Sequence, residues 1–190
     1  MKSVVLFDFF GVIGHELSPF WFRRHFDENV ADATKHRLVD PGDRGAISEV
    51  EMFRNISLET GVAPEQIRRE WMDMVTINEE MVRFIKSVKE SYPVYLLSNA
   101  MSSFLREILE KYDLYGLFDD IYISAELKLA KPDPEFFEEC LSRIGAKAEE
   151  TVMIDDNAKN LDGARSVGID TILFKENESF QAEFKKYYNV

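Results

Sequence analysis

Short runs of β-branched and aromatic residues recur along this chain, and they restrict its fold more than any other feature. The runs lie near residues 3–7, 93–97, 120–123, 151–155 and 170–174. After residue 90 they alternate with segments of helical period, which is the pattern of parallel strands joined by crossover helices. The sequence therefore predicts an α/β fold with a doubly wound parallel sheet covered by helices on both faces.

Polar residues stand where several apolar segments end. These residues are Asp8, Ser98, Asn99, Lys131, Asp155 and Asp156. Ligands of open parallel sheets bind beyond the carboxyl ends of the strands, near the switch in strand order. We therefore expect these side chains to meet at one edge of the sheet.

The segments that carry these residues resemble the four signature motifs of the haloacid dehalogenase-like hydrolase superfamily. In order along the chain they are residues 4–12, 96–99, 129–134 and 152–157. The resemblance spans nearly the whole chain. It implies a hydrolase with the Rossmann-like core of that family.

The resemblance also implies a Mg²⁺ site. In the family's pattern the ligands are the carboxylates of Asp8, Asp155 and Asp156 and the backbone carbonyl of Phe10, all of them the oxygen donors that Mg²⁺ prefers. Asn160 lies four residues after Asp156, which predicts one helical turn between them on the same face. We expect Asn160 to support the metal-binding loop without contacting the ion.

The same resemblance assigns roles around a phosphoryl group. Asp8 would attack the phosphorus and form an aspartyl-phosphate, which requires the negative charge of the ester to be neutralised first. Lys131 would supply an ammonium group between Asp8 and the phosphoryl oxygens. The hydroxyl of Ser98 and the backbone N–H of Asn99 would donate to those oxygens.

Phe10 departs from the pattern, because most phosphatases of the family carry a second aspartate two residues after the first. That aspartate protonates the leaving oxygen, and its loss favours activated esters such as sugar 1-phosphates unless a cap residue supplies the proton. His15 and Glu16 follow the first motif closely enough to point back into the site. Three arginines are candidate substrate clamps, although such side chains are usually solvated: Arg23, Arg24 and Arg44.

Residues 15–80 contain amphipathic stretches without strand alternation, and the family places its smallest helical cap (C1 type) here. Ser48 and Glu51 form a capping box that opens one helix, and Pro64 opens another. We expect their apolar residues to form the core of the cap: Val50, Phe53, Ile56, Leu58, Ile67, Trp71, Met74 and Val75. Residues 43–48 resemble the cap of relatives that include sugar-phosphate phosphatases and the N-terminal domain of soluble epoxide hydrolase. The expected domains are a core of 1–14 and 81–190 and a cap of 15–80.

Two further helices can be predicted. Asp133 is expected to be the N-cap of a helix with Pro134 at its first position. At the end of the chain, aromatic residues at helical spacing predict a helix that covers the sheet: Phe180, Phe184, Tyr187 and Tyr188.

Bulk properties narrow the partners and the compartment. The net charge of −12 argues against nucleic acid and anionic membranes, both of which require clustered basic residues. Cys140 is the only cysteine, so no internal disulfide can form, and its apolar neighbours predict a core thiol. The N-terminal apolar stretch is too short to span a bilayer and lacks a cleavage site, so we expect a cytoplasmic protein. The oligomeric state stays open.

The expected function is a Mg²⁺-dependent phosphomonoester hydrolase that acts on a small phosphorylated metabolite. A competing function is that of a haloacid dehalogenase that uses Asp8 without metal, because those relatives carry an aromatic residue at the place of Phe10. The acidic pair Asp155 and Asp156 argues against a dehalogenase, because the dehalogenases have lost this metal-binding acidic pattern. The sequence leaves two more functions open: a non-catalytic descendant that binds phosphate and Mg²⁺, and a phosphotransferase.

Overall fold

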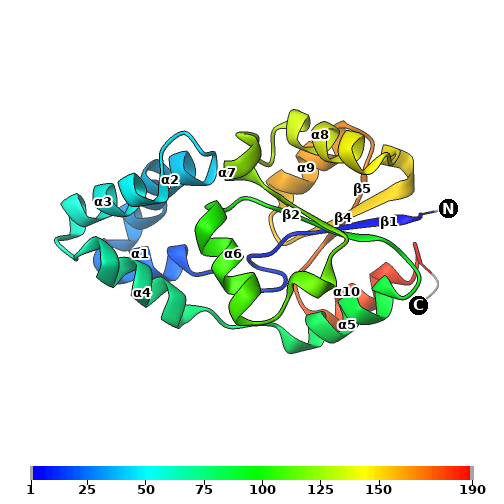
Figure 1. The fold of residues 1–190 in the computed structure, drawn as a ribbon, viewed down its shortest axis with the longest axis horizontal. Helices are drawn as coiled ribbons and strands as arrows, with labels where there is room; N and C mark the ends of the chain where they lie inside the picture. Colours follow the sequence, from blue (N-terminus) through cyan, green and yellow to red (C-terminus); the bar gives the residue numbers. More distant parts are fainter. Residues whose placement is uncertain (1, 189–190) are drawn as a thin grey trace.

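A computed structural model describes residues 2–188 and contains one five-stranded parallel sheet in the order β3-β2-β1-β4-β5 (Figure 1). The strands are β1 (Val4–Phe7), β2 (Val94–Ser98), β3 (Asp120–Ile123), β4 (Thr151–Asp155) and β5 (Asp170–Leu173). The predicted α/β class and all five predicted strand positions are confirmed. The strand order reverses at β1, so the switch point lies at the carboxyl end of this strand.

The register of the sheet brings the predicted motifs to one edge. Phe7 at the end of β1 is paired with Leu96 of β2 and with Ile154 of β4. All four residues of β1 and all five of β4 are buried, as expected for strands covered on both faces. Residues that directly follow these strands therefore emerge side by side.

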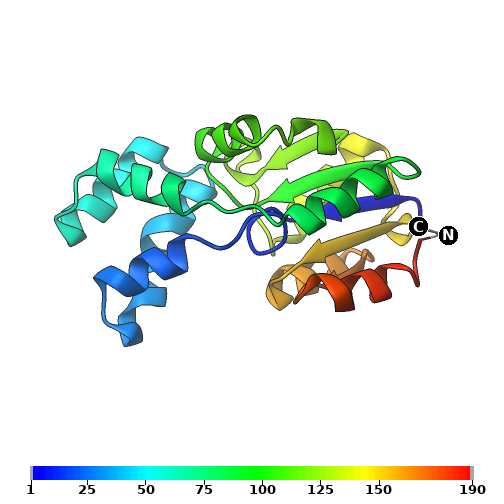
Figure 2. The ribbon, with the colours of Figure 1, turned by 90° about the horizontal axis from the view of Figure 1, so that it is seen from below.

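Helices cover both faces of the sheet (Figures 1 and 2). Their bounds are α1 (Ser18–His25), α2 (Glu28–Asp43), α3 (Glu49–Thr60), α4 (Pro64–Met74), α5 (Glu79–Lys89), α6 (Ser102–Lys111), α7 (Ser124–Leu127), α8 (Pro134–Ile144), α9 (Ala158–Ser166) and α10 (Asn177–Phe184). Apolar residues of α8 and α9 pack on one face, with Cys140 among them as expected. Residues of α5, α6 and α10 pack on the other face.

Helices α1 to α4 lie together beyond one edge of the sheet, at the left of Figures 1 and 2. The predicted capping box of α3 is present: the Ser48 side chain accepts from the N–H of Glu51, and the Glu51 carboxylate accepts from the N–H of Ser48. The prediction that Val50 and Leu58 belong to the apolar core is wrong, because they are 77% and 76% exposed. Met52, together with the predicted Phe53 and Ile56, forms the buried stripe of α3.

Asp133 is the N-cap residue of α8 and Pro134 is the first residue of the helix, as predicted, but the Asp133 carboxylate makes no capping hydrogen bond. It binds the guanidinium of Arg44 instead, at 2.5 Å, across 89 positions of sequence. The C-terminal prediction is confirmed for α10, where Phe180 and Phe184 are buried. It is wrong for Tyr187 and Tyr188, which follow the end of the helix in a turn, although Tyr188 is buried and Tyr187 is half-buried. The Tyr188 hydroxyl donates to the carbonyl of Val4 at 2.6 Å and so ties the end of the described chain to the start of β1.

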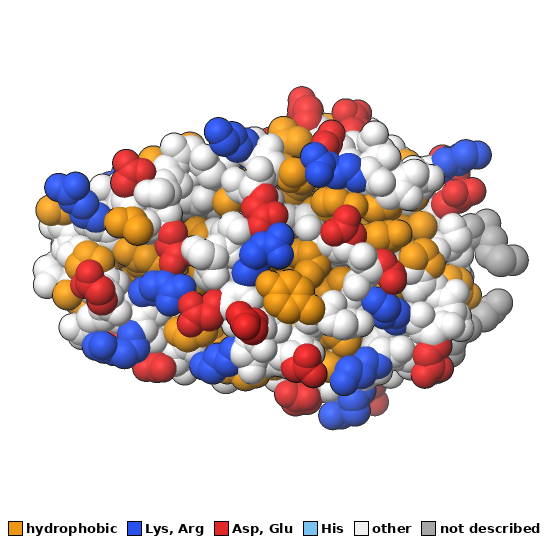
Figure 3. All heavy atoms as spheres, viewed as in Figure 1, with side chains coloured by type: hydrophobic (Ala, Val, Ile, Leu, Met, Phe, Trp, Pro, Cys, Tyr) orange, Lys and Arg blue, Asp and Glu red, His pale blue; other side chains and the backbone are white. Residues whose placement is uncertain are grey.

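Acidic and basic side chains are interspersed over the face seen in Figure 3, so the negative excess is not gathered into one patch there. Among residues 2–188 no helix has the length and hydropathy needed to cross a membrane.

Candidate active site

Asp8 lies directly beyond the carboxyl end of the central strand β1. Its backbone N–H donates to the carbonyl of Ile154 (2.9 Å), and its Oδ1 accepts from the N–H of Phe9 (2.7 Å). Gly11 in the following turn has φ +84°, and a Cβ on this residue would lie 2.1 Å from Oδ2 of Asp156. Glycine therefore permits both the backbone conformation and the close approach of the turn to Asp156.

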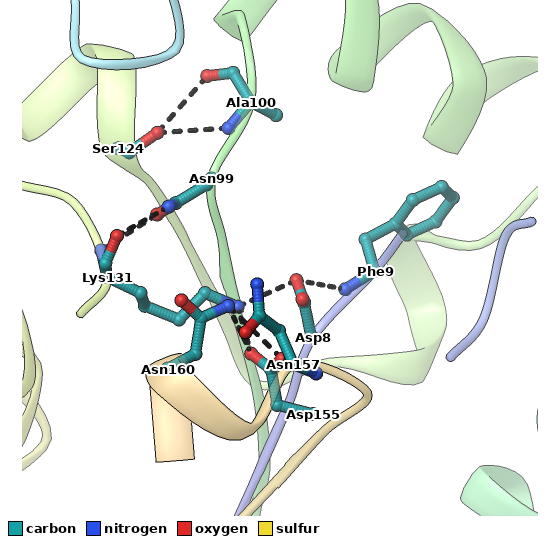
Figure 4. A network of polar contacts seen from close by, with 9 residues as sticks. All are labelled: Asp8, Phe9, Asn99, Ala100, Ser124, Lys131, Asp155, Asn157 and Asn160. Carbon is teal, nitrogen blue, oxygen red and sulfur yellow. Dashed lines mark hydrogen bonds and ion pairs between the residues drawn. The ribbon is translucent and has the colours of Figure 1, made fainter. Parts of the chain in front are cut away.

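Lys131 joins two of the carboxylates (Figure 4). Its Nζ lies 2.8 Å from Oδ1 of Asp8 and 2.7 Å from Oδ2 of Asp155, and its side chain is fully buried. Burial alone would lower the pKa of Lys131, but Asp155 and Asp8 outweigh it and raise the pKa above its usual value. Lys131 therefore keeps its proton and its positive charge in this buried position.

The backbone of Lys131 is fixed by the side chain of Asn99. The Asn99 amide accepts from the N–H of Lys131 and donates to its carbonyl, each at 2.8 Å (Figure 4). This reciprocal pair connects the loop after β2 with the loop before α8. Only the backbone of Asn99 was expected to take part in the site, so this role of its side chain was not predicted.

Asp155 is held by groups at the start of α9. Its Oδ1 accepts from the N–H of Asn157 at 2.8 Å, and both of its oxygens accept from Nδ2 of Asn160 at 3.1 Å. The helix begins only at Ala158, so the prediction that Asp156 and Asn160 share a helix face is wrong. Asn160 contacts Asp155 because the chain turns between Asp155 and the helix.

The carboxylates of Asp8, Asp155 and Asp156 can each offer an oxygen within 4.8 Å of the others. Three carboxylates and the one ammonium of Lys131 leave two negative charges, which a divalent cation would balance. Burial raises the pKa of Asp8 and raises that of Asp156 to about 6, and neighbouring Asp155 adds to both shifts. Hard oxygen donors with an excess of negative charge fit Mg²⁺.

Ser98 ends β2, and its hydroxyl is buried without a hydrogen-bond partner among residues 2–188. An orphaned buried hydroxyl is unusual, and it fits a group that is bound at this edge of the sheet. Phe10 is half-buried, and its ring packs edge-on against Phe9 at 5.0 Å between centroids. A side-chain acid or base is therefore absent at this position.

A cavity of about 260 Å³ lies over these groups. At the sheet edge its lining consists of Asp8, Phe10, Asn99, Ala100, Lys131, Pro132, Asp156, Asn157, Lys159 and Asn160. The other lining residues come from the loop after β1, α1, α2, α4, the loop before α6 and α6 itself. The residues on that side are Glu16, Leu17, Ser18, Lys35, His36, Val39, Asp40, Asp43, Arg44, Trp71, Met101 and Phe104. The cavity thus combines a charged floor with walls that are partly apolar.

Of the five side chains that the sequence offered as additional candidates, Glu16 and Arg44 line the cavity, and His15, Arg23 and Arg24 are not among its lining residues. The guanidinium of Arg23 pairs with Asp32 at 3.2 Å, and both side chains are exposed. Burial raises the pKa of the Glu16 carboxyl above its usual value.

Asp43, at the end of α2, is a cavity residue that was not predicted from the sequence. Burial of its carboxyl raises its pKa from 3.8 to about 7, with smaller contributions from Asp40 and Glu16, against a lowering by Lys35. Nothing in the sequence around Asp43 indicates that its carboxyl is buried at the cavity. Only the tertiary packing of α2 shows that the side chain faces the cavity.

We expect the free energy of unfolding to decrease as the pH rises through about 7. The folded protein holds the Asp43 proton more tightly than the unfolded chain does, so this contribution is complete below the unfolded value of 3.8 and is lost above about 7. The raised pKa of Asp156 acts in the same direction. Urea denaturation with chelator at about pH 5 and about pH 8 measures the difference, which should shrink in Asp43→Asn. An unchanged pH dependence in that variant would contradict the assignment.

Comparison with known proteins identifies the family. The family model described as haloacid dehalogenase-like hydrolase matches residues 2–168. The chain belongs to the haloacid dehalogenase-like hydrolases. A solved member, HAD family enzyme bt-2542 from Bacteroides thetaiotaomicron in complex with magnesium and inorganic phosphate, has 26% sequence identity and a TM-score of 0.79, covering 97% of this chain and 100% of that one.

Two curated relatives extend the comparison within this haloacid dehalogenase-like family. The drimenol cyclase drtB of Aspergillus calidoustus is 26% identical over 153 residues, which are 77% of this chain and 29% of that protein. The sesquiterpene phosphatase astK of Aspergillus oryzae is 27% identical over 131 residues, 67% of each protein. The chain therefore spans less than a third of the first relative and about two thirds of the second.

Proposed function

We propose that this haloacid dehalogenase-like protein is a Mg²⁺-dependent phosphomonoester hydrolase that forms an aspartyl-phosphate on Asp8. The observation that carries the proposal is the buried ammonium of Lys131, which contacts Asp8 and Asp155 in a group of three carboxylates. A structural neighbour that was solved with magnesium and phosphate supports the choice of ion and substrate group. The substrate would be a small phosphorylated metabolite bound in the cavity over this group.

The reaction needs the charge of the ester to be offset before a carboxylate can attack it. Lys131 would neutralise the phosphoryl oxygens next to Asp8, and the hydroxyl of Ser98 would donate to one of them, with the backbone N–H of Asn99 beside it. Asn99 would also keep Lys131 in place through its amide. The unpartnered state of the Ser98 hydroxyl supports this role.

Bound Mg²⁺ would neutralise phosphoryl charge as a Lewis acid. Asp8, Asp155, Asp156 and the backbone carbonyl of Phe10 would hold the ion. Asn160 would orient Asp155 through the two contacts from its amide nitrogen. In this proposal residues 1–14 and 81–190 form the core that carries the reaction, and residues 15–80 form the cap over the cavity.

We expect hydrolysis of p-nitrophenyl phosphate to require a divalent cation. EDTA should abolish turnover and Mg²⁺ in excess should restore it, because without the ion two negative charges of the site repel the substrate. The measurement is release of p-nitrophenolate by protein passed through a chelating column. Undiminished turnover in EDTA would reject the metal-dependent mechanism.

The substrate can be sought with a panel of phosphorylated metabolites. Sugar 1-phosphates beside their 6-phosphate isomers test whether activated esters are preferred, as Phe10 suggests. A sesquiterpenyl monophosphate belongs in the panel because a relative is named a sesquiterpene phosphatase and the cavity has apolar walls, including Leu17, Trp71 and Phe104. Transfer of phosphate to added alcohols would instead indicate a phosphotransferase.

A haloacid dehalogenase is the second candidate, and Phe10 is the observation that favours it. A metal-free displacement of halide has no use for Asp156, whose carboxylate lies with those of Asp8 and Asp155. Halide release from 2-chloropropionate in the presence of EDTA would decide for the dehalogenase. Binding of phosphate and Mg²⁺ without turnover of any ester would indicate a non-catalytic descendant.

A further inference from the structure

One step of the proposed reaction lacks a proton donor. When the bond between phosphorus and the ester oxygen breaks, the leaving oxygen becomes negative unless an acid protonates it. Phe10 cannot do this, and Lys131 is engaged by two carboxylates at the bottom of the site. The donor must therefore come from elsewhere around the cavity.

The geometry of phosphoryl transfer restricts where the donor can lie. The nucleophile and the leaving oxygen are roughly in line on opposite sides of the phosphorus. With Asp8 at the sheet edge, the leaving oxygen points away from β1, toward helices α1, α2 and α4 that form the other side of the cavity. Three acidic residues lie on that side: Glu16, Asp40 and Asp43.

Asp43 is the acid that is fixed against the loop after β2. Its carboxyl accepts a hydrogen bond from the backbone of Met101, three residues after Ser98. Its own carbonyl accepts from the hydroxyl of Ser124, which also accepts from the N–H of Ala100 at 2.9 Å. The carboxyl and the carbonyl of Asp43 are thus both tied to this loop, which directly follows Ser98.

The other two acids are less suitable donors. Asp40 lies about half exposed and contacts the ring of His36 at 3.2 Å. Glu16 precedes α1, and the charges of Asp155 and Lys131 act on it as well as that of Lys35, so it lies closer to the three carboxylates than Asp43 does. Asp43 has neither of these features.

We propose that Asp43 is the general acid of this enzyme and takes the place of the aspartate that Phe10 replaces. This inference rests on the proposed function and adds a catalytic residue to it. An oxygen of Asp8 bonds to phosphorus, the ester P–O bond breaks with its electron pair on the leaving oxygen, and the Asp43 proton moves to that oxygen to give the alcohol. Asp43 regains a proton from the water that then attacks the aspartyl-phosphate, which releases phosphate and restores the Asp8 carboxylate.

The surroundings of Asp43 suit this role. The charged groups that act on it are Lys35, Asp40 and Glu16, and Arg44 follows it in sequence. Burial raises the pKa of the Asp43 carboxyl, and the charges of Asp40 and Glu16 raise it further, whereas Lys35 lowers it. The resulting pKa is about 7. An acid with a pKa near the working pH can both give up and regain a proton.

The test compares leaving groups. We expect Asp43→Asn to lower kcat/KM for phenyl phosphate by about 10²-fold or more and to affect p-nitrophenyl phosphate far less, because nitrophenolate leaves without a proton. A series of substituted phenyl phosphates should give a steeper dependence on leaving-group pKa in the variant than in the wild type. kcat/KM is used because it reports the step in which the ester bond breaks.

Asp32→Asn is the matched control, since Asp32 lies on the same helix with an exposed side chain that pairs with Arg23. It should keep the leaving-group dependence of the wild type. An equal loss on all substrates in Asp43→Asn, or no loss, would overturn the role of Asp43 while leaving the phosphatase intact. Absence of Mg²⁺-dependent turnover in the wild type would instead reject the proposed function.

The wild type provides a second measurement if Asp43→Asn does not fold. Its kcat/KM for phenyl phosphate should decrease as the pH rises above about 7, where Asp43 loses its proton, relative to kcat/KM for p-nitrophenyl phosphate. A pH-independent ratio of the two values would overturn the proposal.

Discussion

Replacing Asp8 by asparagine is expected to reduce turnover of p-nitrophenyl phosphate by about 10⁴-fold or more, because the amide cannot form the covalent intermediate. The fold should persist, because asparagine is similar in size to aspartate and carries no charge. Burial already disfavours the charged form of Asp8, as the raised pKa of its carboxyl indicates. Steady-state rates with Mg²⁺ and urea denaturation of the same preparations provide the two measurements.

Asp32→Asn is again the appropriate control, because it makes the same chemical change on the surface. Turnover by Asp8→Asn within about tenfold of the wild type would exclude Asp8 as the nucleophile, since loss of an essential group costs far more. Trapping of phosphate on the wild-type protein but not on the variant would identify the covalent step directly.

Replacing Lys131 by methionine is expected to damage both activity and stability. The side chain is fully buried between Asp8 and Asp155, so its loss leaves two buried carboxylates without their cation. Breaking such a pair from one side typically costs about 3–5 kcal/mol, and losing one group that stabilises the transition state costs about 10²- to 10³-fold in rate. Urea denaturation in chelator and rates with Mg²⁺ measure the two effects.

A double variant separates charge from packing. Asp8→Asn combined with Lys131→Met should recover part of the lost stability, because one of the uncompensated charges is then removed. Purely additive losses would indicate that Lys131 contributes by packing alone. A Lys131→Met variant as stable as the wild type would contradict the buried ion pair.

The fold was largely predictable, because each buried parallel strand is a continuous apolar run in the sequence and a polar residue marks the end of that run. Asp8 and Asp155 could be placed in this way, since each lies at the carboxyl end of a strand and the register aligns β1 with β4. This signal is local in sequence. It therefore required no knowledge of how distant segments pack.

Predictions failed where a distant partner decided the contact. Asp133 occupies the N-cap position as predicted, but its carboxylate binds Arg44, 89 residues away, and makes no capping hydrogen bond. Val50 and Leu58 are apolar, yet the stripe of α3 that is buried is set by the neighbouring helices. Asp43 could not be recognised for the same reason, because its contacts to Ser124 and Met101 form only in the folded chain.

The hydrogen bond between Tyr188 and Val4 has a consequence for engineering. Both ends of the described chain lie at the amino-terminal edge of the sheet, opposite the cavity (Figures 1 and 2). Adjacent ends of this kind favour circular permutation and tolerate fused domains. A fluorescent reporter or an additional domain attached there would lie away from the cavity.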